Sequence, residues 1–262
     1  MYGVDKEYKM AALNEKQIRD GFNYFYRDEE HPKSVVEVSE YDDEDKLIIN
    51  CTQLDEGYSA KDKKRILQEW CDFLVEHPDA FTELMFCTRM PQELFDAVCA
   101  QRRLKKLHIK WGVYPDISKL ENLQELEYLH IGSGRSVSSL EPISRLVNLV
   151  ALSIENFQQI DDYAPLANLK HLESLALEGD FAAPKILKVQ SLEFLRHMKR
   201  LRFFSFLTAK VIDKDYSPIL ELNNLEHLTL KSCKEVKQLY PQLIKLPKLK
   251  YGTVLERPEL YE

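Results

Sequence analysis

The stretch that decides the fold is PISRLVNLVALSIENFQQIDDYAPLANLKHLESLALEGD, which runs from Pro142 to Asp180. It holds two consecutive copies of the pattern apolar-x-x-apolar-x-apolar. Outward from this stretch, the pattern recurs between Leu104 and Tyr251 at steps of 21 to 29 residues. A repeat of this length predicts a solenoid, in which each unit packs on the next and the terminal units need caps.

The apolar pair that ends each copy predicts one strand per repeat. The two residues of a pair flank a single position, so they point to the same face of a strand. Stacked strands then bury that face as one continuous core. The pairs are Leu107/Ile109, Leu129/Ile131, Leu152/Ile154, Leu175/Leu177, Phe204/Phe206 and Leu228/Leu230, with a looser seventh pair at Leu249/Tyr251.

The unit that begins at Pro165 matches a known family pattern nearly position for position. With Leu166, Leu169, Leu172, Leu175 and Leu177 it resembles leucine-rich repeats of the short bacterial, internalin-like kind, which read roughly P-L-x-x-L-x-x-L-x-x-L-x-L. The resemblance extends less regularly over residues 115–252. It implies an α/β fold: a leucine-rich repeat solenoid with one curved parallel sheet, capped by an N-terminal α/β segment.

Two departures from the family pattern concern the turns. The family commonly places Asn after the strand, whereas this chain has Gly112, Gly134, Phe157, Asp180, Ala209 and Cys233 there. We therefore expect turns closed by glycine, by Asp180 or by water. The step from Leu177 to Phe206 is also long, and we expect the extra residues 180–191 to form a loop on one face.

We divide the chain into an N-terminal cap over 1–103, repeats over 104–255 and a polar tail over 256–262. In the cap, Asn14 is an expected N-cap of a helix with Ile18, Phe22 and Phe25 on one face, packed on the end of the solenoid. Residues 34–51 predict a hairpin around an acidic turn, and residues 83–88 predict a strand that extends the sheet backwards. Two further helices are expected, after Ser59 and from Pro91.

Composition limits the kind of partner. The 262 residues are 44% hydrophobic and 30% charged, and the formal net charge is -7. Negative charge opposes binding to phosphate backbones, so we expect no nucleic acid partner. No apolar stretch predicts a membrane segment or a secretory signal, so we expect a cytoplasmic protein. We also expect a monomer, and the resemblance to internalin-like repeats implies a bacterial protein.

Catalytic and metal motifs are not found in the sequence. No Gly-rich phosphate loop, nucleophile elbow or His-Glu-x-x-His is present. The five cysteines form no Cys-x-x-Cys pair and predict reduced, mostly buried thiols, Cys71 included. His108 and His130 should be neighbours, but two imidazoles without a third ligand are more typical of exposed polar residues than of a zinc site. We therefore expect no cofactor, no metal and no catalytic residue.

The residues between the apolar positions predict the binding surface. In a parallel sheet they form columns about 4.8 Å apart on the exposed concave face. Tyr128 and Phe203 are expected aromatic anchors, and Glu155 with Glu178 an acidic pair. The full set of candidate partner-binding residues is Tyr128, His130, Ser153, Glu155, Glu178, Phe203, Ser205, Leu207, His227 and Lys231.

Three function classes follow. The sequence favours a non-catalytic scaffold that binds a protein partner on the concave face by rigid presentation of a preformed surface. The alternatives are an immunity or inhibitor protein that blocks a toxin or enzyme, and an enzyme that uses Cys71 or the two histidines. We expect Trp111 and Tyr114 to be core residues between the cap and the repeats. We expect the acidic run from Glu40 to Lys46 to be a solvated turn.

Overall fold

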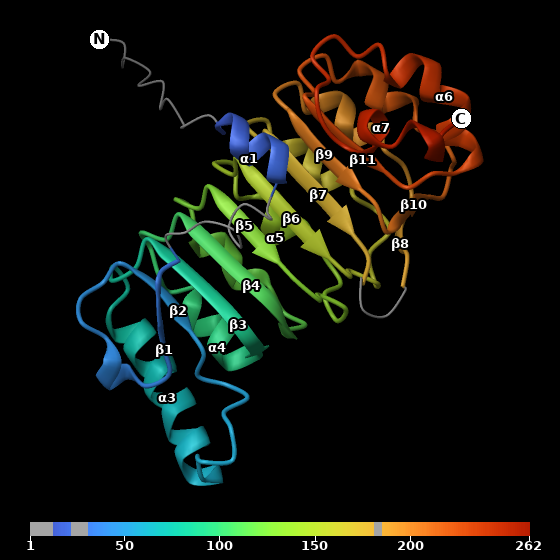
Figure 1. Cartoon of the computed structure of the whole chain (residues 1–262). Helices are drawn as coiled ribbons and strands as arrows, with labels where there is room; N and C mark the ends of the chain where they lie inside the picture. The colour runs from blue at the N-terminus through green and yellow to red at the C-terminus, as the bar shows by residue number, and fades with distance from the viewer. Residues whose placement is uncertain (1–12, 22–30, 181–184) are drawn as a thin grey trace, which may run out of the picture.

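The structure is a computed structural model that describes residues 13–21, 31–180 and 185–262. Nine strands within these ranges form one parallel sheet that follows chain order, apart from β8 and β10, which pair with each other (Figure 1). Their bounds are β1 Lys33–Val35, β2 Lys46–Ile49, β3 Glu83–Pro91, β4 Lys106–Val113, β5 Tyr128–Ile131, β6 Ala151–Glu155, β7 Ser174–Glu178, β9 Phe203–Phe206 and β11 His227–Leu230. The predicted leucine-rich repeat solenoid is confirmed.

Short helices carry the chain back along the convex side of the sheet. They are α4 Gln92–Val98, α5 Glu141–Ser144, α6 Lys234–Leu243 and the 3-10 turns Ser118–Asn122, Ala164–Asn168, Glu193–His197 and Ser217–Glu221. The repeat leucines between them and the strands are fully buried, as Leu166, Leu169, Leu172 and Leu175 illustrate. Each such side chain contributes about 1.5–3 kcal/mol by leaving water, so the repeat core holds the solenoid together.

Glycine and packing close the turns where the family has Asn. Phe157 is fully buried beside Gly134, where an added Cβ would lie 1.9 Å from the Phe157 ring. The Asn156 side chain, one position before the expected one, donates to the Asp180 carboxylate at 3.3 Å. Aromatic filling and one displaced amide therefore replace the regular Asn column.

Residues 31–103 extend the same sheet, and the strands predicted to form a hairpin are parallel neighbours in it. β1 pairs with β2 in parallel, and β2 pairs with β3 in the same sense. Between β1 and β2 the chain turns through a 3-10 helix, Val38–Glu40, because the Glu40 carboxylate accepts the backbone N–H of Glu37 at 2.9 Å. That local bond overrides the alternating pattern of residues 34–41. The acidic turn itself is largely exposed, with Asp42 and Asp43 in solvent.

The helices of the cap begin where the sequence predicts. Ser59 caps α3, Ala60–Glu76, by accepting the N–H of Asp62, and Pro91 is the N-cap of α4. Trp70 of α3 is fully buried and its indole N–H donates to the Val36 carbonyl at 2.8 Å. These contacts make the N-terminal part continuous with the solenoid core.

The insertion contributes one strand to a second, small sheet. β8, Leu187–Val189, pairs in parallel with β10, Ala209–Val211, and the two are a separate sheet. Leu187 and Val189 are fully buried. The expected loop over 180–191 is therefore wrong for residues 187–189, because their apolar residues alternate into the core.

The last residues cap the solenoid, which corrects the expected polar tail. α7, Thr253–Glu256, and a 3-10 turn, Pro258–Leu260, bring Tyr261 into the core, where it is 2% exposed. The Tyr261 hydroxyl donates to the carbonyl of Leu230 at 2.6 Å. One aromatic ring with a hydroxyl can thus both cover the last strand and satisfy one of its carbonyls. Within the described ranges, none of the helices combines the length and the apolar character that a membrane crossing requires.

Candidate functional site

The predicted columns of the concave face are confirmed strand by strand. His108 pairs with His130, His130 with Ser153, and Ser153 with Ala176, which in turn pairs with Ser205. The last copy is out of register with the prediction: Tyr251 pairs with His227, so the Tyr251 ring lies on the concave face. The sequence thus predicts which side chains share this face, although not whether they are exposed.

The predicted exposure was wrong for five of the ten candidate residues. Tyr128 is 8% exposed and Phe203 is 6% exposed, so neither is a free aromatic anchor. His130, Ser153 and Ser205 are buried as well. Glu155, Glu178 and His227 are half-buried, and Leu207 and Lys231 are exposed. The face therefore has a buried part and an accessible part.

Helix α1, Glu15–Asp20, covers the amino-terminal end of this face (Figure 1). Asn14 is its N-cap, as predicted, and forms a capping box with Gln17. Its expected position on the solenoid end is wrong: it lies across the strands because its apolar side chains find a pocket there. Phe22 and Phe25, the other residues expected on its buried face, lie outside the described residues.

The contact between α1 and the sheet is a second, small hydrophobic cluster. Ile18 is fully buried and Leu13 is 4% exposed. They pack on residues in or next to successive strands, namely Tyr128, Val150, Ala151, Ala176, Phe203 and Tyr251. The small side chains predicted for the centre of the face leave the room that the Ile18 side chain fills.

Polar contacts fix the backbone of this segment. The backbone N–H of Leu13 donates to Oε2 of Glu173 at 3.1 Å, and Nη1 of Arg202 donates to the Leu13 carbonyl at 2.7 Å. The same guanidinium pairs with Glu173 at 3.0 Å. Glu173 and Arg202 thus hold both polar groups of one peptide residue, and we call them the backbone clamp.

The backbone clamp belongs to a ladder of alternating charges. Each residue lies directly before its strand, and neighbouring strands bring opposite charges together: Glu173, Arg202, Glu226 and Lys250. Glu173 also pairs with Arg200 at 3.3 Å and is 4% exposed. Alignment of the repeats reveals this alternation, so the sequence carried a signal for the backbone clamp that we did not use.

Two further contacts anchor the ends of α1. The Tyr251 hydroxyl donates to Oε1 of Glu15 at 2.5 Å. Gly21 follows the helix with φ 58°, and a Cβ there would lie 2.5 Å from the Phe203 ring. A residue with a side chain would therefore meet both backbone strain and a clash at this position.

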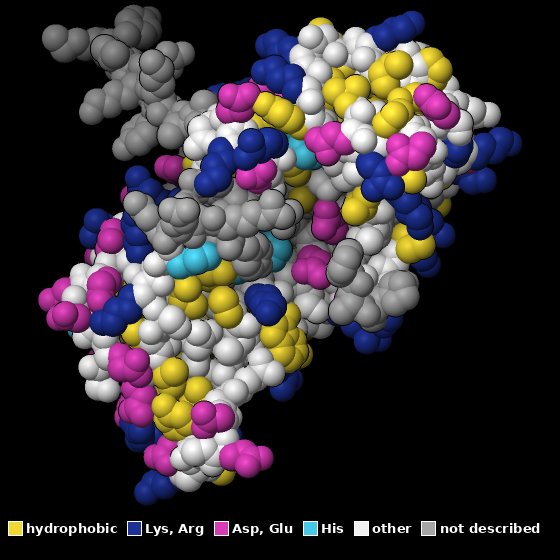
Figure 2. Space-filling view, viewed as in Figure 1, with side chains coloured by type: hydrophobic (Ala, Val, Ile, Leu, Met, Phe, Trp, Pro, Cys, Tyr) yellow, Lys and Arg dark blue, Asp and Glu magenta, His cyan; other side chains and the backbone are white. Residues whose placement is uncertain are grey.

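The accessible part of the face lies at the carboxyl-terminal ends of the strands. Glu155 of β6 and Glu178 of β7 are paired in register, and Ser205 donates to Glu178 at 2.6 Å. Burial, together with the charges of Asp180 and Glu178, raises the pKa of Glu155 to about 7. Acidic side chains (magenta) are gathered over the middle of this face in Figure 2. Leu207 directly follows β9 and Lys231 directly follows β11.

The two histidines stack on each other and are not exposed polar residues. The rings of His108 and His130 are 4.3 Å apart and nearly parallel, and His130 Nδ1 lies 3.0 Å from the Ser153 hydroxyl. Burial lowers the pKa of His130 to about 4, and burial with the His130 charge lowers that of His108. Neutral imidazoles can form such a stack without repulsion. Over the part of the chain that the structure describes, no three potential ligands gather as a metal site needs.

Burial raises the pKa of the Cys51, Cys71, Cys87 and Cys99 thiols. All five cysteines are free thiols; Cys51 and Cys99 are buried, and the other three are half-buried. Burial is the first cause that raises the pKa of Cys71 to about 11, followed by the charges of Glu93 and Asp72. A thiol with this pKa is almost entirely protonated at neutral pH, so Cys71 is a poor nucleophile.

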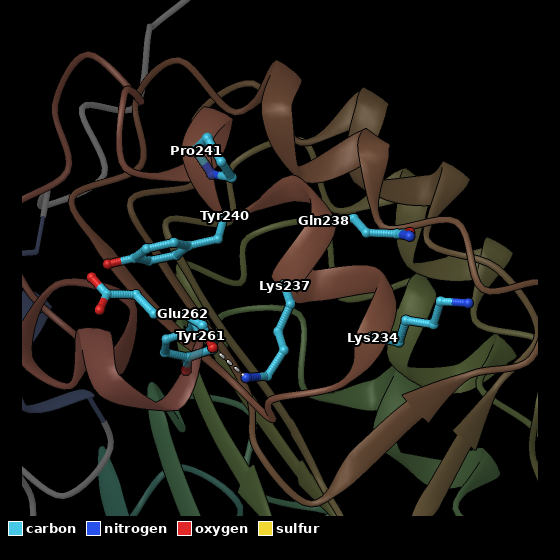
Figure 3. Close-up of a pocket in the computed structure, with 7 residues that line it drawn as sticks. All are labelled: Lys234, Lys237, Gln238, Tyr240, Pro241, Tyr261 and Glu262. Atoms are coloured by element: carbon cyan, nitrogen blue, oxygen red, sulfur yellow. Dashed lines mark hydrogen bonds between the residues drawn. The ribbon is translucent and has the colours of Figure 1, made fainter.

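A separate hollow of about 690 Å³ lies between α6 and the end of the chain (Figure 3). Tyr240 and Tyr261 stack at its wall with ring centroids 5.5 Å apart. The Lys237 ammonium donates to the Glu262 carbonyl at 2.7 Å. These contacts hold the C-terminal cap on the last repeat.

Comparison with known proteins identifies the fold. No family model and no curated protein matches the sequence. Among solved structures, an internalin (InlF) from Listeria monocytogenes is similar over 79% of this chain, with 17% identity and a TM-score of 0.50. A leucine-rich repeat protein from Leptospira interrogans is similar over 84%, with 16% identity and a TM-score of 0.51.

The chain spans about half the length of these two proteins, 51% of the first and 53% of the second. Repeat period, sheet topology and structural similarity agree. This chain therefore has a leucine-rich repeat fold similar to that of an internalin.

Proposed function

We propose that this protein is a non-catalytic scaffold that binds a protein partner on its concave face. The observation that supports the proposal is that this face already holds a polypeptide segment, residues 13–21, by apolar and backbone contacts together. A face that fits one segment of chain so closely has the shape and the polar groups for protein recognition. Its continuous core makes it rigid, which lowers the entropic cost of binding.

The accessible part of the face is the proposed partner surface. It is the carboxyl-terminal end of β6 to β11, with Glu155, Glu178, Leu207 and Lys231 as its contact residues. Leu207 supplies apolar area at 37% exposure, and the two carboxylates favour a partner with a basic side chain at this point. The buried candidates Tyr128, His130, Ser153, Phe203 and Ser205, with the half-buried His227, support this surface from the covered part of the face.

The test is affinity capture from the native lysate with matched surface variants. Leu207→Asp places a charge on the proposed surface, whereas Val75→Asp makes the same kind of change on exposed Val75 of α3, away from the sheet face. We expect the Leu207 variant to lose the captured protein and the Val75 variant to retain it, with melting temperatures unchanged. Equal capture by both variants would refute the proposed surface.

A further inference from the structure

We propose that the covered half of the concave face is a peptide-binding site, and that the protein's own residues 13–21 occupy it until a partner peptide of the same chemistry displaces them. This inference rests on the proposed function and adds the class of ligand and its regulation. It concerns the amino-terminal ends of the strands, whereas the surface around Leu207 is at the opposite ends.

The first step is that the site binds a peptide both by hydrogen bonds to its backbone and by packing around an apolar side chain. The backbone clamp binds the N–H and C=O of one residue through Glu173 and Arg202, at 3.1 and 2.7 Å, and this contact is indifferent to the side chain. The pocket around Ala151, Ala176 and Phe203 accepts an apolar side chain, here that of Ile18. Backbone contacts of this kind supply affinity, and the pocket supplies specificity.

The second step defines the ligand. The occupying segment is Leu-Asn-Glu-Lys-Gln-Ile-Arg-Asp-Gly, residues 13–21. A competing peptide therefore needs an apolar residue at the backbone clamp, a helix N-capping residue next, and an apolar residue five positions after the first. The position that corresponds to Gly21 favours glycine, because a Cβ there would lie 2.5 Å from the Phe203 ring. Such a peptide is a short amphipathic helix preceded by one clamped residue.

The third step is that the occupant can be displaced. α1 has six residues, and a helix of that length is not stable in water without its packing partners. Its buried contacts come chiefly from Leu13 and Ile18. Attachment to the solenoid gives the segment an effective concentration of order mM, which a free peptide must overcome. The segment therefore weakens, without abolishing, the binding of any peptide with the same pattern.

The test uses the full chain and a synthetic peptide of residues 9–21, acetyl-KMAALNEKQIRDG-amide. Ile18→Asp detaches the segment by placing a charge in the pocket. Gly21→Ala detaches it by strain and by the Phe203 contact, so either variant suffices if the other misfolds. Saturation-transfer NMR titration compares both variants with the wild type. A peptide in which Asp replaces the isoleucine is the control.

We expect each folded variant to bind the peptide at least about ten-fold more tightly than the wild type, because its site is empty for a larger fraction of the time. The Asp-containing peptide should bind none of the three proteins. Equal binding by wild type and folded variants, or none by any of them, would overturn the inference. A wild-type dimer in sedimentation would also overturn it, since the occupant would then be a second copy. None of these results depends on capture at Leu207, so the two proposals can fail separately.

Discussion

The carbonyl oxygen of Leu13 lies 2.7 Å from Nη1 of Arg202, although 189 positions separate the two residues in the chain. The Leu13 N–H is bound at the same point by Glu173. This pair of bonds ties the N-terminal segment to the middle of the solenoid. The bound N-terminal segment therefore buries the part of the concave face that it covers.

The buried carboxylate of Glu173 should matter for stability. We expect Glu173→Gln to lower the free energy of unfolding by about 2 kcal/mol, because charged hydrogen bonds to Arg200, Arg202 and Leu13 are weakened. Urea denaturation at pH 7 measures the change. Glu121→Gln is the control: its partner Arg145 is exposed, so the expected loss is below about 0.5 kcal/mol. Equal losses would contradict the buried backbone clamp.

Phe203 should behave as a core residue. We expect Phe203→Ala to cost about 3 kcal/mol of stability, since the ring is 6% exposed and packs against His227 and α1. Leu207→Ala, on the same strand face but exposed, should cost at most about 0.5 kcal/mol. Thermal and urea denaturation distinguish the two. A Phe203 variant as stable as the wild type would mean that the aromatic ring is free in solution.

Glu155 should make stability depend on pH. Its pKa is raised from 4.5 to about 7 in the folded protein, so the folded state binds the proton more tightly than the unfolded state does. Stability from this group is complete below about pH 4.5 and is lost as pH rises through 7. Glu155→Gln removes the effect and should stabilise the protein more at pH 8 than at pH 5.

The difference in melting temperature between the Gln variant and the wild type, taken at each pH, isolates this group from the others. Glu141→Gln, an exposed change on α5, is the control and should give the same difference at both pH values. A Glu155→Gln difference that is also independent of pH would refute the raised pKa.

The cysteines should react slowly in the native protein. Burial raises the pKa of Cys51 to about 12 and that of Cys99 as well. We expect these two thiols to react with Ellman's reagent at pH 8 at least about a hundred-fold more slowly in the native state than in urea. Mass mapping of the labelled sites identifies them. Rapid native labelling of Cys51 or Cys99 would contradict the burial of these two thiols.

Sequence patterns predicted the solenoid and its register because both depend on local spacing. The apolar pairs from Leu107/Ile109 to Leu228/Leu230 fix which residues point to the core, and a shift by one residue would reverse every side chain. Caps were also local: Asn14 and Ser59 were correct because a capping side chain bonds a backbone group within three residues.

Long-range contacts explain what the sequence did not predict. The apolar residue Ile18 predicts that one face of α1 is buried. It does not predict whether that face packs on the end of the solenoid or across the sheet. The hairpin prediction failed because alternation in residues 34–41 is equally compatible with the turn that Glu40 stabilises. The exposure of Tyr128 and Phe203 depends on α1, which is far away in sequence.

The central claim is that the protein's own N-terminal segment covers half of the concave face. Hydroxyl-radical footprinting with mass spectrometry tests it directly, comparing the labelling of Tyr128 and Phe203 in the wild type and in Ile18→Asp, with exposed Leu207 as internal reference. We predict weak labelling of both aromatic residues in the wild type and a several-fold rise in the variant. Strong labelling of Tyr128 and Phe203 in the wild type, unchanged in the variant, would contradict the account.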